Sequence, residues 1–413
     1  MDPLPRAAPD LTLDLLRDPY GFIGRHCDRL GTDGFRTRLA LRPVACLRGP
    51  EAAAFFYDGG RFGRAGAMPP ITLRLLQDKG SVQGLEGGAH RHRKAMFLAL
   101  CREPGRVADL EAAFLREWDD AEARWLARGE ARLLPDANRM LARAAVAWAG
   151  LDWGRLGGDR FAADLEAMVA NAAGLGPRAW AALGRRRRAE RAVMAELARL
   201  RAGTHPAPPD APARAVAGHR DEEGRPLPPE AAAVEVLNLL RPILAVGRFV
   251  ADAAQALERE PGLRERLRAG PALLEGFAEE VRRVARFFPL VGGRALRDLD
   301  WRGAALPEGS WVLLDLWGTG QDPRAVPDPG RFDPARPLSW RDEGHAPIPQ
   351  GAGRAAETHR CPGEAITVAL MAAATRRLLA LDYQVGPEAL ASPRFRYPPS
   401  PRDGFRMTGL GRR

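Results

Sequence analysis

The sequence predicts a mainly α-helical fold with small β-sheets. Apolar residues recur at three- and four-residue spacing along most of residues 89–290, whereas short strand-like runs are confined to residues 34–66 and 293–315. A hydrophobic fraction of 46% is ample for a large core, and 28% charged residues exclude a mostly disordered chain. We therefore expect one large domain over residues 1–413, although the length alone would allow about three.

The hydrophobic pattern divides the chain up to residue 260 into a strand-rich part, a helical part, a Pro-rich loop and an apolar segment. In residues 34–66, FRTRLAL and PVACLRG are typical of strands, and GPEAAAFFYDGG of a helix ended by a glycine pair. Helices fill about 89–200. Residues 204–230 are Pro-rich and polar, which predicts a long surface loop without helix or strand. Residues 231–260 are apolar on nearly all sides and should cross the core.

The carboxy-terminal part alternates between the two kinds of structure. We expect helices over residues 262–287, short strands over 293–315, an irregular loop over 345–364, and one amphipathic helix over 364–385. No stretch reaches the ~20 apolar residues of a membrane span, and the first residues lack the pattern of a secretory signal. These features predict a cytoplasmic protein.

The net charge of +10 suggests nucleic acid as a partner. However, nearly all basic residues are Arg, with Lys only at Lys79 and Lys94, and they alternate with acidic residues. The densest run, Arg185 to Arg188, should lie on an exposed helix. Nucleic-acid binding is therefore the weakest reading, and we expect none.

Arg241 is a basic residue in the apolar segment VLNLLRPILAV. A buried guanidinium needs an anion, so two readings stand. Arg241 either pairs with an internal acid such as Glu235 or reaches solvent, or it binds a carboxylate or phosphate. The adjacent Pro242 lacks an N–H and should kink the helix.

Three motifs follow in order. Glu280 and Arg283 are one helical turn apart, Phe332-Asp-Pro-Ala-Arg336 comes next, and a Gly-rich loop ends in HRCPGE with Cys361 before a helix. The four cysteines are scattered, so chemistry at any of them involves a lone thiolate. Taken alone, the Glu280–Arg283 pair and the cysteine before Pro-Gly each favour a structural role.

Together, E-x-x-R, F-x-P-x-R and H-x-C-x-G resemble the carboxy-terminal half of cytochromes P450. The resemblance implies that the fold holds haem b (iron protoporphyrin IX) between the long central helix and the cysteine loop. Cys361 would be the axial ligand of the iron. Glu280, Arg283 and Arg336 would form the buried triad that supports the loop.

Two departures narrow the resemblance. The central helix has Asn238-Leu-Leu-Arg241-Pro242 where ordinary members carry an acid–alcohol pair, and Gly353 lies eight residues before Cys361 instead of four. Both features, with PQG at 349–351, are similar to the bacterial fatty-acid peroxygenase branch. The likeness implies that Arg241 holds a long-chain fatty acid by its carboxylate, which acts as general acid–base on hydrogen peroxide.

This branch implies hydroxylation at the α or β carbon, with some decarboxylation to alkenes, and no need for NAD(P)H, flavin or a redox partner. Gln83 would lie beside the haem and the first carbons of the substrate, and Leu290 would line the cavity. His90, Arg93 and Lys94, on one helical face, would reach the haem propionates. The structural alternatives are that Gln83 is an ordinary loop amide and Leu290 a core residue. The three basic residues would then be surface charges.

His359 would also approach a propionate. Two rival functions remain open at this point. One is a conventional haem-thiolate monooxygenase that receives electrons from a redox partner, which the missing acid–alcohol pair disfavours. The other is a non-catalytic haem- or fatty-acid-binding protein.

Overall fold

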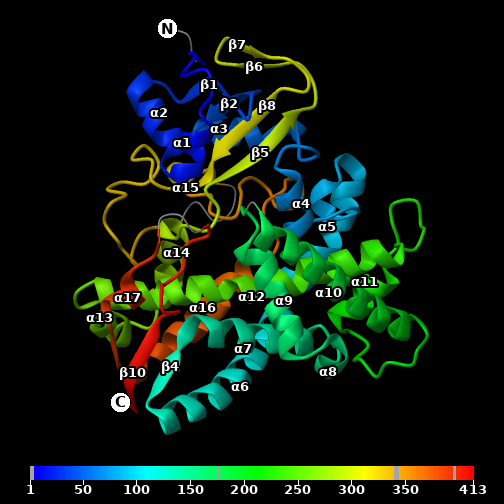
Figure 1. Cartoon of the computed structure of the whole chain (residues 1–413), viewed down its shortest axis with the longest axis vertical. Coiled ribbons are helices and arrows are strands. Elements are labelled where there is room, and N and C mark those ends of the chain that lie inside the picture. The colour runs from blue at the N-terminus through cyan, green and yellow to red at the C-terminus, as the bar shows by residue number, and fades with distance from the viewer. Residues whose placement is uncertain (1–3, 175, 339–343, 394–396) are drawn as a thin grey trace. The chain divides into compact units, whose positions relative to one another are not determined.

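The structure of the protein is a computed structural model that describes residues 4–174, 176–338, 344–393 and 397–413 (Figure 1). Its contacts divide the chain into two compact units. The first unit comprises Met1–Pro70, Gln83–Gly87 and Arg282–Cys361, and the second comprises Ile71–Val82, Gly88–Val281 and Pro362–Arg413. A single domain over the whole chain stays a prediction.

The first unit is built on a β-sheet. In the described residues its five strands have the order β1-β2-β8-β5-β3, and β6 pairs with β7 in a separate hairpin. The pair β2–β8 is parallel, and the other neighbours are antiparallel. The strands are β1 (Gly34–Leu39), β2 (Arg42–Leu47), β3 (Phe62–Gly63), β5 (Leu290–Ala295), β6 (Leu299–Trp301), β7 (Ala304–Leu306) and β8 (Trp311–Asp315).

Helices cover this sheet, and one of them, α2, contacts β1 (Figure 1). Successive side chains of a strand point to opposite faces, so the buried apolar residues of the sheet divide into two core clusters: Ala45 and Leu47 of β2 belong to one, and Val44 and Cys46 to the other. The strands and the helix expected in residues 34–66 are confirmed. The helical segments are α1 (Thr12–Arg17), α2 (Phe22–Leu30), α3 (Pro50–Tyr57), the 3₁₀ turn η1 (Asp58–Gly60) and α15 (Leu316–Thr319).

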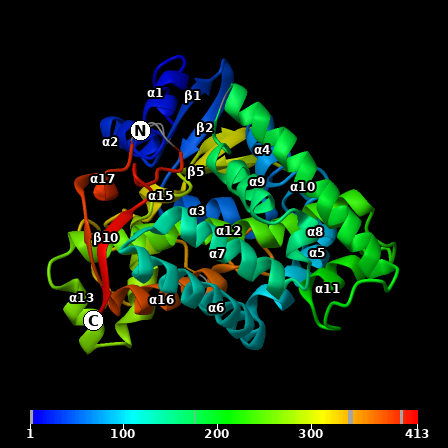
Figure 2. The same ribbon diagram turned by 60° about the horizontal axis from the view of Figure 1, so that its bottom comes forward.

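The second unit is mostly helical and surrounds α12 (Pro229–Arg259), which packs against α7, α9, α10, α11 and α16 (Figure 2). Every residue from Ala232 to Ala251 is buried except Pro242, so the expected core-crossing segment is confirmed. The other helices are α4 (Pro70–Leu76), α5 (Gly87–Arg102), α6 (Pro104–Arg128), α7 (Leu133–Trp148), α8 (Trp153–Leu156), α9 (Asp159–Ala170), α10 (Pro177–Arg201), α11 (Pro212–Gly218), α13 (Leu263–Ala269), α14 (Leu273–Val284), α16 (Glu364–Leu379) and α17 (Pro387–Leu390).

Three expectations for this unit were wrong. Residues 204–230 contain the helix α11, which begins at Pro212, where the missing N–H of proline costs nothing. The predicted helix over 364–385 ends at Leu379, and LDYQV forms the strand β9 (Leu381–Val385). The helical stretch is also interrupted by β4 (Glu130–Arg132), which pairs with β10 (Arg406–Arg412).

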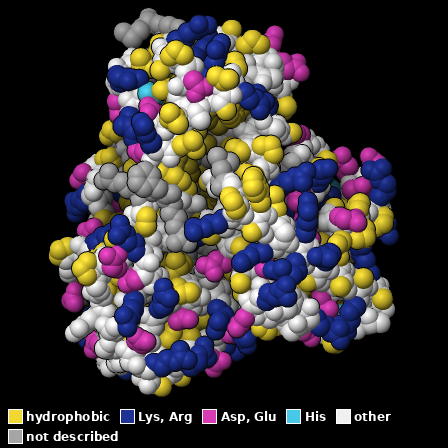
Figure 3. Space-filling model, in the orientation of Figure 1, with side chains coloured by type: hydrophobic (Ala, Val, Ile, Leu, Met, Phe, Trp, Pro, Cys, Tyr) yellow, Lys and Arg dark blue, Asp and Glu magenta, His cyan; other side chains and the backbone are white. Residues whose placement is uncertain are grey.

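The charges are distributed largely as the sequence indicates. On the face seen in Figure 3, basic and acidic side chains are interspersed. Arg185 and Arg187 on α10 are exposed as expected, but Arg186 is only 1% exposed, which corrects the expectation of a fully exposed run. No described helix combines the length and apolar content needed to cross a bilayer.

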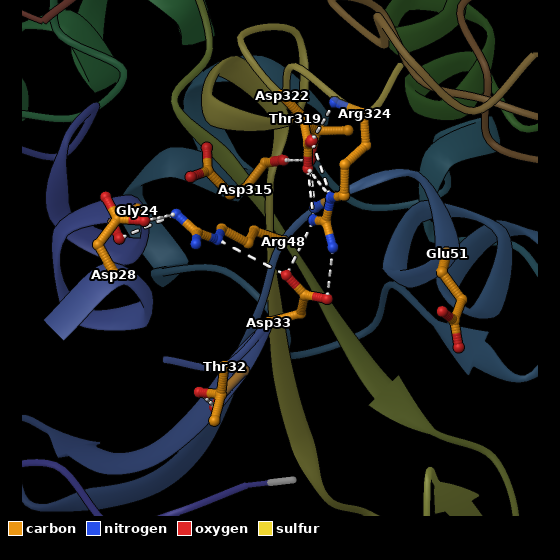
Figure 4. A network of polar contacts seen from close by, with 12 residues as sticks. Gly24, Asp28, Thr32, Asp33, Arg48, Glu51, Asp315, Thr319, Asp322 and Arg324 are labelled. Carbon is orange, nitrogen blue, oxygen red and sulfur yellow. Dashed lines mark hydrogen bonds and ion pairs between the residues drawn. The ribbon is translucent and has the colours of Figure 1, made fainter. Parts of the chain in front are cut away.

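A polar network in the first unit connects β2, the loop before β1, and the segment after β8 (Figure 4). Arg324 donates to both oxygens of Asp33 at 2.8 Å, and Asp315 caps α15 by accepting from the Gly318 N–H at 2.7 Å. Burial raises the pKa of Asp315 to about 7, against the Gly318 hydrogen bond and the charge of Arg48. By contrast, Arg324 and Arg302 outweigh burial and hold the pKa of Asp33 below its usual value.

Asp315→Asn should therefore stabilise the protein more at pH 8 than at pH 5. Between its unfolded pKa of about 4 and its folded pKa, Asp315 keeps a proton that the unfolded chain releases, so stability falls as pH rises. Asn keeps the capping oxygen without the charge, and the gain at pH 8 should reach up to roughly 4 kcal/mol. Urea unfolding at both pH values measures this.

The matched control is Asp33→Asn. Because the pKa of Asp33 is lowered, its stabilising charge is present at both pH values, and this variant should lose similar stability at pH 5 and pH 8. An equal change for Asp315→Asn at the two pH values would show that Asp315 does not titrate in this window.

Candidate active site

The cysteine loop is shaped by two glycines with left-handed backbone. Gly351 has φ 102° and Gly353 φ 73°, values that favour glycine. A Cβ on Gly351 would also lie 2.9 Å from the Cα of Arg360, so only glycine allows the loop segments around these two residues to lie this close together. The backbone N–H of Cys361 donates to the Gln350 carbonyl at 2.9 Å, which closes the loop.

Cys361 differs from the other three cysteines in its burial, and none of the four forms a disulfide. Cys27, Cys46 and Cys101 are buried, and burial raises the pKa of Cys27 to about 12 and that of Cys46 well above its usual value. The thiols of Cys27 and Cys46 therefore stay protonated. Cys361 is only partly buried, and the Gln350 Nε2 donates to its Sγ at 3.6 Å.

Gln350 contacts the Cys361 sulfur, although the sequence did not single it out beyond the PQG of the resemblance. Its Oε1 accepts from the Nε of Arg282 at 2.9 Å, and Arg282 is 1% exposed. The guanidinium therefore fixes and polarises the amide that faces the Cys361 sulfur. No sequence pattern joins Gln350 to Arg282, because the two residues are 68 positions apart in the chain.

On α12, the Arg241 side chain is 5% exposed and has neutral partners only. Its Nη1 donates to the carbonyls of Leu75, at 3.2 Å, and of Leu76, and its Nη2 is 3.5 Å from the Asn238 Oδ1. Within the described part of the chain, no carboxylate forms an ion pair with it. Burial, and then the charge of Arg186, lower the pKa of Arg241 to about 9.

The internal acid that was an alternative partner for Arg241 is used elsewhere. Glu235 is fully buried, and its Oε1 accepts from the Arg93 Nη1 and from the Val82 N–H, both at 2.8 Å. Its Oε2 accepts from the Asn238 Nδ2 at 3.0 Å. Both structural alternatives for Arg241, pairing with Glu235 and reaching solvent, are therefore wrong.

Comparison with known proteins places this site in a family. A solved variant of cytochrome P450SP alpha (CYP152B1) is 40% identical, covers 98% of this chain and 100% of its own, and superposes with a TM-score of 0.94. The chain is a cytochrome P450 of the CYP152 group. Cytochrome P450EX alpha (CYP152N1) with myristic acid is 33% identical at a TM-score of 0.93, and each chain is covered to 99%. Ligand-free cytochrome P450 OleT is 28% identical and superposes with a TM-score of 0.94, again with 99% of each chain covered.

Sequence matches alone are shorter. The family description "Cytochrome P450" matches residues 254–385 of this P450. Cytochrome P450 CYP199A2 of Rhodopseudomonas palustris is 30% identical over 153 residues, which is 35% of either chain. The chain thus aligns with only about a third of the length of that curated relative. The whole-chain structural matches confirm the predicted fold class and branch, and membership makes this chain a haem-thiolate oxidoreductase.

The residues of this P450 fit a haem. The one cysteine outside the buried interior lies in a loop where an amide N–H faces its sulfur, a donor set suited to an iron-bound thiolate. On α5, His90, Arg93 and Lys94 are 4%, 7% and 3% exposed, so the alternative of mere surface charge is wrong. Arg93 already pairs with Glu235, and contact of these three with propionates stays a prediction.

The other predicted residues of the first unit occupy defined places. The His359 Nε2 is 3.6 Å from the Glu86 Oε2, and its approach to a propionate is untested. Gln83 is half-buried in the 3₁₀ turn η2 (Val82–Gly84). Leu290 begins β5 and packs against the core cluster around Phe35, while a cavity role stays a prediction.

The predicted triad is partly brought together. Arg283 and Arg336 both donate to the Arg331 carbonyl, at 3.4 and 3.0 Å, so they hold the same stretch of chain. Glu280 and Arg283 are each 3% exposed, whereas Arg336 is only partly buried, which corrects the expectation of a fully buried triad. The joint support of the cysteine loop by all three stays a prediction.

Gln350→Leu should lower the Fe(III)/Fe(II) midpoint potential of the haem-loaded protein by roughly 20–40 mV. An N–H donor to the thiolate withdraws electron density, and losing a hydrogen bond worth about 0.5–1 kcal/mol favours the ferric state by that amount. Potentiometric titration measures the change, with the exposed Gln384→Leu as control. A potential that matches the wild type would show that the 3.6 Å contact is electronically unimportant.

Proposed function

We propose that this P450 uses hydrogen peroxide to hydroxylate long-chain fatty acids at the α or β carbon, with decarboxylation to alkenes as a side reaction. One observation carries the proposal: the buried guanidinium of Arg241 has only neutral oxygens around it. A cation held in an apolar helix without a counter-ion is costly, and a substrate carboxylate removes that cost.

Relatives support a carboxylic acid as the ligand. CYP152N1 has been solved with myristic acid, and CYP152B1 with (R)-ibuprofen, and both ligands carry a carboxylate. Arg241 of this chain can offer a carboxylate two N–H donors in the fixed geometry that only arginine provides. We therefore assign substrate binding to the acid head group, with Gln83, Pro242 and Leu290 beside the first carbons.

Haem iron bound by a thiolate supplies cleavage of the peroxide O–O bond. In this chain, Cys361 provides the thiolate and Gln350 donates to its sulfur. Arg241 holds the substrate carboxylate, and that carboxylate moves a proton between the two oxygens of hydrogen peroxide as general acid–base. The α12 sequence Asn238-Leu-Leu-Arg241 has no side-chain acid of its own for this transfer. The proposal therefore needs no NAD(P)H, flavin or redox partner.

Product analysis tests the proposal. Purified haem-loaded protein with myristate and hydrogen peroxide, and no reductase, should form 2- or 3-hydroxymyristate, and a short carboxylic acid such as acetate should support oxidation of a non-acid substrate. Product that forms only with NADPH and redox proteins would establish the conventional monooxygenase instead. Binding of haem and fatty acid without product under either condition would establish a binding protein. Cytoplasmic location stays a prediction.

A further inference from the structure

Arg186 is a second buried arginine that meets Arg241 at the same backbone oxygen. The Arg186 Nη1 donates to the Leu75 carbonyl at 2.9 Å, and the Arg241 Nη1 donates to that carbonyl at 3.2 Å. The two residues come from neighbouring helices, α10 and α12, which are in contact. A convergence of two guanidinium groups on one neutral acceptor is unfavourable unless something else holds the cations or an anion joins them.

Arg186 is held firmly by its own partners. Its Nε donates to the Glu190 Oε1 at 2.7 Å and to the Asp78 Oδ2 at 3.2 Å, and its Nη2 donates to the Gln77 carbonyl at 3.3 Å. Because its side chain is 1% exposed, these contacts leave it one orientation. Arg186 therefore fixes the chain from Leu75 to Asp78, which comprises the last two residues of α4 and the two residues after it, including the left-handed Asp78 with φ 69°.

The pinned turn is also what orients Arg241. The carbonyls of Leu75 and Leu76, at the carboxy-terminal end of α4, are the nearest acceptors of its Nη1. Displacement of this turn would leave Arg241 with only the long contact to Asn238. The charge of Arg186, next to burial, also lowers the pKa of Arg241, so the two cations interact electrostatically.

We infer that Arg186 is a positioning residue for carboxylate recognition. It holds the Leu75–Asp78 turn against Arg241, while Glu190 and Asp78 balance its own charge. The inference rests on the proposed function, because it acts through Arg241. Arg186 is not a catalytic residue, because it acts only through the Leu75–Asp78 turn, whose Leu75 carbonyl it shares with Arg241. A purely structural role would tie α10 to the turn without affecting acids more than neutral ligands.

The test compares two ligands with the same chain, laurate and 1-dodecanol, by isothermal titration calorimetry on haem-loaded protein. Arg186→Gln should raise the Kd for laurate about tenfold, because the turn that orients Arg241 toward the carboxylate is no longer held. The Kd for dodecanol should change less than about twofold. Arg187→Gln, an exposed neighbour on α10, is the matched control and should change neither. Arg186→Lys keeps the positive charge and should weaken laurate binding less than Arg186→Gln does. If the Gln variant fails to load haem, the Lys variant is measured in its place.

A double-mutant cycle separates positioning from structure. In an Arg241→Ala background, Arg186→Gln should have almost no further effect on laurate, because its route to the carboxylate is gone. Equal weakening of laurate and dodecanol, unchanged laurate binding, or additive effects in the cycle would overturn the inference. If Arg241→Ala itself leaves the acid-to-alcohol ratio unchanged, the proposed function fails first, and the two failures are thus distinguished.

Discussion

Arg241→Ala should reduce peroxide-driven hydroxylation of myristate by roughly 10³-fold or more. The variant removes the group that holds the carboxylate, and with it the general acid–base that such catalysis supplies, worth about 10²–10⁴-fold. Loss of a charge-assisted hydrogen bond should also weaken binding of the acid. Initial rates of hydroxymyristate formation, normalised to haem content, measure the effect.

Arg248→Ala is the control on the same helix. Arg248 is 6% exposed, lies about two turns beyond Arg241, and donates at 3.4 Å to the Pro398 and Pro399 carbonyls. Its loss should lower stability but leave turnover per haem within a few-fold of wild type. If Arg241→Ala hydroxylates myristate as fast as this control does, Arg241 has no catalytic part, and its burial serves the fold alone.

Glu235→Ala should lower the free energy of unfolding by about 3–5 kcal/mol. Glu235 is fully buried, and its removal leaves the guanidinium of Arg93 without its partner and the Val82 N–H without its acceptor. Losing one member of a buried pair costs more than the pair contributes, because the remaining charge stays desolvated. Denaturant unfolding of the haem-loaded protein measures the loss.

Glu230→Ala provides the comparison, since Glu230 is exposed on the first turn of α12 and should change stability by less than about 0.5 kcal/mol. Replacing Glu235 and Arg93 together by Gln and Met should recover part of the loss, because no unpaired charge remains. A single Glu235 variant as stable as the Glu230 variant would mean that Arg93 finds another partner.

The sequence predicted what depends on local pattern. The helix α12 was evident because a long, uniformly apolar segment has to be buried wherever it lies. The cysteine loop was recognised because its glycines, His359 and Cys361 occur at fixed spacing. Strands as short as β4 have no periodicity to detect, and LDYQV continues the apolar pattern of α16 so closely that the helix could not be separated from β9.

Contacts between distant segments could not be predicted. Arg186 belongs to a run of four arginines and has the pattern of an exposed residue, yet Asp78 and the Leu75 carbonyl, more than 100 positions away, make its burial favourable. Gln350 likewise acquires significance only from Arg282. The alternative pairing of Glu235 with Arg241 was wrong for the same reason. Both residues lie on α12, but Glu235 pairs with Arg93 of α5, which is 142 positions away in the chain.

The strand order of the first unit has a consequence for biosynthesis. β2 and β8 are adjacent and parallel, although they are separated by the whole helical part of the chain. At a translation rate of roughly 5–20 residues per second, the edge of β2 waits on the order of 15–50 s for its partner to leave the ribosome. During that time its Ala45–Leu47 backbone is an unpaired template that other chains could join. The nascent protein should therefore aggregate more than the complete chain does when it refolds from denaturant. A chaperone that covers nascent strands should raise the yield of folded protein.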